Sequence, residues 1–68
     1  MDTSHISLAV NPDDHDVAYL SLPGHPGKGT PGCVTKTVRL ASLLPYKGPD
    51  LYLDFDAQGH LIGVEVLA

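Results

Sequence analysis

The segment from Asp54 to Glu65 holds the residues whose types and spacing come closest to a known chemical site. Its acidic, amide and glycine positions match the calcium-loop pattern D-x-[DN]-x-[DN]-G-x₅-E, with Gln in place of Asp or Asn: Asp54, Asp56, Gln58, Gly59 and Glu65. Carboxylate oxygens are the ligands that calcium prefers. The loop works only between two helices that aim these oxygens inward, so the flanking elements decide the question.

Both flanks of this segment predict strands instead of helices. Three residues of the sequence follow Glu65, and residues 49–53 are too few and too regularly alternating for an entering helix. In a β-hairpin, Asp56 suits the first position of a type I turn, and Gly59 can adopt the left-handed conformation that closes a three-residue loop with a bulge. We therefore expect a hairpin and no calcium site.

The expected hairpin register divides its side chains between two faces. Asp56 then faces His60, Phe55 faces Leu61, Leu53 faces Gly63 and Tyr52 faces Val64, because opposed residues share a face. One face is a core face, with Leu51, Leu53, Phe55 and Leu61. The second face is too apolar to meet water, and we predict a partner-binding surface there: Tyr52, Ile62, Val64 and Val66.

A metal or ligand site is the rival prediction for the same hairpin. It would use Asp54, Asp56 and Glu65, with His60 as a further ligand. In the expected register Glu65 lies on the opposite face from Asp54 unless the strand bulges, so the three carboxylates would not converge. We therefore predict no metal site.

No other group of residues predicts a cofactor or a catalytic centre. The four histidines and Cys33 lack the short C-x₂-C or H-x₃-H spacing of structural zinc. Cys33 follows a Gly/Pro-rich loop, but no base is placed beside it in the sequence. We expect no catalytic residue, no cofactor and no enzymatic activity.

The rest of the chain also predicts strands and turns. Apolar and polar residues alternate over residues 4–10 and 34–40, and residues 17–22 are apolar at nearly every position. Residues 11–16 favour one helical turn or a tight loop, and residues 43–49 a connection. We expect an all-β fold, a five-stranded antiparallel meander or half barrel with at most one short helical turn.

The length predicts one domain, residues 1–68, whose core is small. A Pro/Gly-rich stretch at residues 23–32 predicts a mobile loop. At 68 residues an unassisted core is marginal, and a single cysteine rules out an internal disulfide. Association is the remaining source of stability once metal is set aside. An exposed strand edge at residues 17–22 or 60–67 would offer one route to it.

Charge and hydropathy limit the partners. The formal net charge is −4, and the four basic residues are scattered singly, which argues against direct nucleic-acid binding. No run of about 20 apolar residues is present, so we expect no membrane insertion. The N-terminal residues lack a signal-peptide pattern, which predicts a cytoplasmic location. The expected partner is a second copy of the chain or another small protein.

Two motifs resemble a known family. Asp16, Tyr19, Leu20 and Leu22 match a Y-D-x-x-A-D-x-x-Y-I-x-L pattern, and the C-terminal run YLDFDAQGHLIGVEVLA matches D-x-D-x-x-G-x-x-x-G-I-E-I-L. The chain thus resembles the small bacterial domain-of-unknown-function family 2283, although Asn11 and His15 depart from the pattern. The resemblance implies a compact, mostly β domain without an assigned activity. It also implies an antitoxin-like role as partner of a small toxin, since some members are encoded beside toxin-like nucleases.

Overall fold

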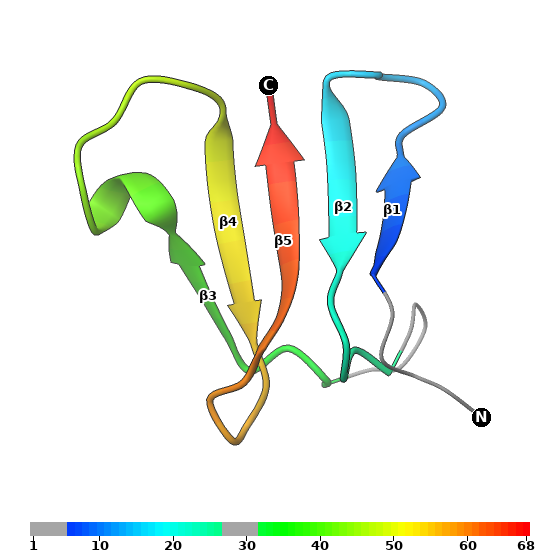
Figure 1. The fold of residues 1–68 in the computed structure, drawn as a ribbon, viewed down its shortest axis with the longest axis vertical. Coiled ribbons are helices and arrows are strands. Elements are labelled where there is room, and N and C mark those ends of the chain that lie inside the picture. Colours follow the sequence, from blue (N-terminus) through cyan, green and yellow to red (C-terminus); the bar gives the residue numbers. More distant parts are fainter. Residues whose placement is uncertain (1–5, 27–31) are drawn as a thin grey trace.

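The computed structural model shows one open, antiparallel sheet of five strands (Figure 1). It describes residues 6–26 and 32–68. The strands are β1 (Ser7–Val10), β2 (Val17–Ser21), β3 (Lys36–Arg39), β4 (Asp50–Phe55) and β5 (Leu61–Leu67). One turn of 3-10 helix, η1 (Leu40–Ser42), follows β3. The predicted all-β fold class is confirmed.

The strand order is β1-β2-β5-β4-β3, so the C-terminal strand lies at the centre of the sheet. β2 and β3 follow one another in the sequence, yet β5 and β4 lie between them, and β1 and β3 form the two edges (Figure 1). The segments that we expected to offer a free edge, 17–22 and 60–67, are therefore paired on both sides. That expectation was wrong, because pairing between β2 and β5 joins distant parts of the chain.

The first connection is a loop closed by its own polar side chains. The Asn11 side-chain oxygen accepts a hydrogen bond from the Asp13 N–H at 2.9 Å, and Asp14 accepts one from the Asp16 N–H at 3.1 Å. The backbone N–H of Asn11 donates to the Val17 carbonyl at 2.9 Å, which aligns β1 with β2. Asx turns of this kind compete with helix formation. One helical turn or a tight loop was predicted for residues 11–16, and the structure has the tight loop.

The predicted ends of three segments shift in the structure. β1 begins at Ser7, while residues 4 and 5 of the expected strand lie outside the described residues. The strand expected over residues 34–40 covers Lys36–Arg39. Of the Pro/Gly-rich stretch 23–32, residues 27–31 lie outside the described part, so its mobility stays a prediction.

The β4–β5 hairpin has the predicted turn. The Asp56 N–H donates to the His60 carbonyl at 3.0 Å, and the Gly59 N–H donates to the Asp56 carbonyl at 3.1 Å. Gly59 has φ +83°, the left-handed conformation that glycine adopts without a steric cost. The Asp56 carboxylate also accepts the backbone N–H groups of Gln58 and His60, both at 2.9 Å.

A β-bulge changes the register beyond this turn. Phe55 faces Leu61 as predicted, but the register shifts between Asp54 and Phe55, so Asp54 faces Gly63, Leu53 faces Val64 and Tyr52 faces Glu65. The predicted pairs Leu53–Gly63 and Tyr52–Val64 were wrong by one residue. A one-residue shift moves every following side chain of β5 to the other face of the sheet.

The described residues contain no second layer. Figure 1 shows the strands side by side, without a helix or strand lying across them, and the shortest dimension of the molecule is 20 Å. Among the described residues, Ile62 is the only buried apolar side chain, 1% exposed. No helix in the described ranges has the length and apolar character needed to cross a membrane.

Candidate functional site

One face of the sheet is apolar from edge to edge. A row of five opposed residues crosses all five strands, one from each: Leu8, Leu20, Val64, Leu53 and Val38. A second row crosses four strands: Val10, Ala18, Val66 and Leu51. We call these nine side chains the apolar face. None of them carries a charge or a hydrogen-bonding side chain.

The apolar face is only partly shielded from solvent. None of its nine side chains is buried: seven are half-buried, and Leu8 and Val10 at the β1 edge are 63% and 50% exposed. Contiguous apolar surface of this kind marks interaction sites in soluble proteins.

The bulge places the predicted partner-binding residues differently from the expectation. Val64 and Val66 lie together on the apolar face, beside Leu53 and Leu51. Ile62 lies on the same side of β5 as the two valines, but it is 1% exposed. Tyr52 pairs with Glu65 on the opposite face. The shared face predicted for the four residues was therefore wrong for Tyr52, since it depended on a register without a bulge.

The opposite face of the sheet, which we call the polar face, carries the charged and hydroxyl groups. One row contains Ser7, Ser21, Gly63, Asp54 and Thr37, and the next contains Ala9, Tyr19, Glu65, Tyr52 and Arg39. Glu65 and Asp54 thus share a face, contrary to the prediction, because the register shift moves Glu65 across the sheet.

A hydrogen-bonded group centres on Asp54. The Tyr19 hydroxyl donates to one Asp54 carboxylate oxygen at 2.8 Å, and the Thr37 hydroxyl donates to the other at 2.8 Å. These contacts join β2, β4 and β3 across the polar face. Burial, and next the hydrogen bond to Asp54, raise the pKa of the Tyr19 phenol above its ordinary value, so Tyr19 remains a hydrogen-bond donor at neutral pH.

The Tyr19 side chain reaches Asp54 by passing over Gly63 of β5. A Cβ atom added at Gly63 would stand 2.5 Å from Cζ of Tyr19 and closer still to its hydroxyl oxygen. The ring also meets His25 edge-on, with centroids 5.7 Å apart. The glycine is therefore needed for the tyrosine to cross the central strand.

Other polar side chains of this face and of the hairpin also hold the fold together. Arg39 forms a bidentate contact with Asp50, at 2.9 and 3.1 Å from Nε and 2.9 Å from Nη2. The hydrogen bond to Arg39 holds the pKa of the Asp50 carboxyl below its ordinary value. The backbone N–H of His60 is the main cause of a lowered pKa at Asp56.

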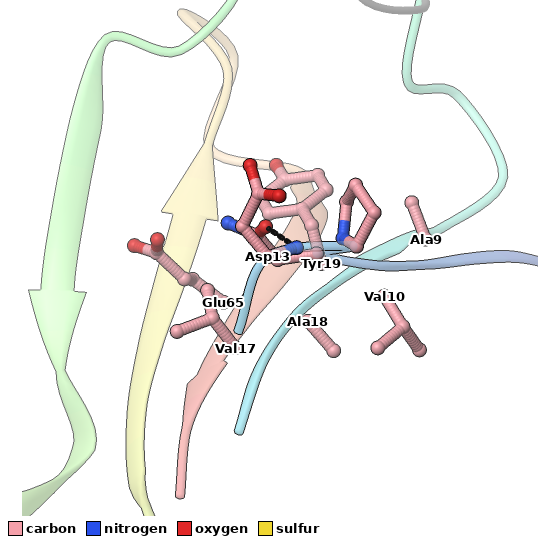
Figure 2. A pocket seen from close by; sticks show the side chains of 9 residues that line it. Ala9, Val10, Asp13, Val17, Ala18, Tyr19 and Glu65 are labelled. Atoms are coloured by element: carbon pink, nitrogen blue, oxygen red, sulfur yellow. Dashed lines mark hydrogen bonds between the residues drawn. The ribbon is translucent and has the colours of Figure 1, made fainter. Parts of the chain in front are cut away.

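A hollow beside the first turn has two acidic residues in its lining. It has a volume of about 290 Å³ and is lined by Asp13, Tyr19 and Glu65 together with residues of β1 and β2 (Figure 2). Within residues 6–26 and 32–68, no three His, Cys, Asp or Glu side chains are placed to hold a metal ion. Oδ1 of Asp56 accepts the backbone N–H groups of Gln58 and His60, so Asp56 and Gly59 of the calcium-loop pattern also serve the hairpin turn.

Sequence reasoning missed the contribution of β1, β2 and β3 to the apolar face. The signal is present, since Leu8 and Val10, Ala18 and Leu20, and Val38 each occupy alternate positions of a predicted strand. The strand order was needed to join these separate sets into rows. The bulge was needed to add Val64 and Val66 to them.

These features define a class of protein: a small all-β chain whose single open sheet has one polar, hydrogen-bonded face and one apolar face. The model of the family described as "Protein of unknown function (DUF2283)" matches residues 13–68. The chain belongs to this family, as the two sequence motifs predicted. No curated protein and no solved structure matches it.

Proposed function

We propose that this protein is a protein-binding module without catalytic activity, and that the apolar face is its binding surface. The observation that supports the proposal most directly is the pair of apolar rows, nine side chains of which none is buried. Surface of this composition gains free energy when another protein covers it, at roughly 25 cal/mol per Å² before the costs of association.

The polar groups favour a structural role over a catalytic one. Asp54 accepts hydrogen bonds from two side chains, and Asp56 accepts two backbone N–H groups within its turn. These hydrogen bonds give both carboxylates a role in holding strands and turn together.

A hydrophobic dye tests whether the apolar face is available to a partner. We expect the dilute protein to bind anilinonaphthalene sulfonate, because the dye occupies open apolar surface. Val64→Asp places a charge at the centre of the five-residue row and should lower the dye emission severalfold. Circular dichroism of the variant separates this effect from unfolding.

The matched control is Glu65→Gln, one residue further along β5 and on the polar face. It should leave dye binding unchanged. A folded wild-type monomer that binds no dye would contradict the proposal, since the apolar face would then be covered by the chain itself.

A further inference from the structure

We infer that the partner on the apolar face is a second copy of this chain, packed face to face so that β1 of each copy lies over β3 of the other. The inference rests on the proposed function, because it names the occupant of the same face. The product is a two-layered β-sandwich with two-fold symmetry.

The exposed area of the chain matches what such a dimer requires. The whole chain exposes 4910 Å². A compact monomer of 7.2 kDa is expected to expose about 4100 Å². The difference of about 800 Å² equals the area that each partner buries in a protein interface of standard size.

The dimensions of the chain agree with this comparison. Its radius of gyration is 12.5 Å, whereas about 11 Å is expected for a closed domain of this length. A single layer is more extended than a closed domain with the same number of residues. A second sheet stacked about 10 Å away would provide the missing layer.

Charge does not oppose the pairing. Each chain has a net charge of −4, but the nine side chains of the apolar face carry none of it. The charged residue of the described strands on that side is Lys36 at the β3 edge, which is exposed and opposite in sign to the net charge. The described carboxylates of Asp54 and Glu65 lie on the polar face and point away from a partner placed on the other side. Like charges of the two copies are thus separated by both sheets.

Two face-to-face arrangements are possible, with the two-fold axis parallel or perpendicular to β5. The shape of the apolar face favours the first. At the β1 edge, Ile6, Leu8 and Val10 are 61%, 63% and 50% exposed. At the β3 edge there is a hollow of about 480 Å³. Val38, Leu43 and Phe55 are its apolar lining, and Lys36 and Asp56 are its charged lining. We call the edge with the exposed apolar side chains the projecting edge and the other the hollow edge, because exposed side chains of one can fill the space at the other.

A two-fold axis parallel to β5 brings the projecting edge of each copy over the hollow edge of the other. The five-residue row then lies over the same row of the partner subunit in reverse order. Leu8 lies over Val38 of the partner subunit, and Val64 lies over Val64 of the partner subunit. An axis perpendicular to β5 would place the two projecting edges against each other and leave both hollows empty. Close packing favours the first arrangement.

Chemical cross-linking tests both the dimer and its arrangement. The variants Leu8→Cys and Val38→Cys are prepared separately in a Cys33→Ser background, so that only the introduced thiols react. Each is treated alone and as an equal mixture with a bismaleimide spanning about 10 Å, the distance between stacked sheets. We expect the mixture to give the 8–38 cross-link, and each variant alone to give at most a trace.

The matched control uses Ser7→Cys and Thr37→Cys, on the same two strands but on the polar face, and should give no cross-link. Cross-links of 8 to 8 or 38 to 38 would overturn the proposed arrangement. The absence of every cross-link would overturn the second copy as occupant. Dye binding by that monomer would leave the proposed function standing, whereas a monomer without dye binding would overturn both.

Discussion

Gly63 and Tyr19 show how two single residues determine a contact across the polar face of the sheet. The glycine leaves room for the tyrosine ring to cross β5, and the ring delivers its hydroxyl to Asp54. This polar contact joins β2 to β4 across β5 on the polar face. A residue without a side chain in the central strand is thus what allows the contact.

Gly63→Ala tests this dependence. The added methyl group would displace the Tyr19 ring, so we expect a loss of about 1–3 kcal/mol in the free energy of unfolding. In a Tyr19→Ala background the same substitution should cost much less, because the obstructing ring is gone. Urea unfolding of the wild type, the two single variants and the double variant measures the coupling. Equal costs in both backgrounds would contradict the account.

At the scale of elements, the β4–β5 hairpin decides which side chains form the apolar face. The turn from Asp56 to His60 has the expected hydrogen bonds, and the bulge next to it brings Val64 and Val66 to the side of Leu51 and Leu53. Without the bulge the two valines would lie on the same side as Asp54. The binding surface therefore depends on one extra residue in β5.

Gly59→Ala tests the turn that fixes this register. A Cβ atom at Gly59 would meet nothing within 4 Å, so its cost is conformational only. We expect about 1–2 kcal/mol of destabilisation, since φ is +83°. Gly59→Asn should cost clearly less, because asparagine tolerates the left-handed conformation. Equal thermal shifts for the two variants would show that the left-handed turn is not what stabilises the hairpin.

Local sequence patterns predicted the strands and the hairpin turn, but they could not predict which strands pair with one another. Alternation identified four of the strands, an apolar run over residues 17–22 identified the fifth, and Asp56 with Gly59 identified the turn, because these signals depend on neighbouring residues. The bulge was not predictable from them, since Ile62 and Gly63 suit either register. The position of β5 between β2 and β4 depends on contacts between residues more than 40 positions apart, such as Tyr19 and Glu65. Val64 and Val66 therefore share a face as predicted, Tyr52 lies on the other face, and partner binding by these residues stays a prediction.

At the scale of the whole molecule, the described residues form a single open sheet. This sheet buries Ile62 and leaves nine apolar side chains without cover from the described residues. A small chain without a disulfide gains stability when association completes its core. Binding and folding are then linked, and the stability of the protein should rise with its concentration.

The central claim is that a second copy of the chain covers the apolar face. Its most direct test is the solution mass from light-scattering chromatography for the wild type, Leu8→Asp and Ser7→Asp, with and without calcium. The two substitutions lie on adjacent residues of the same edge strand, but only Leu8 belongs to the apolar face. The account predicts twice 7.2 kDa for the wild type and for Ser7→Asp, 7.2 kDa for Leu8→Asp, and no effect of calcium. A wild-type mass of 7.2 kDa at every concentration, or equal dissociation of both variants, would contradict it.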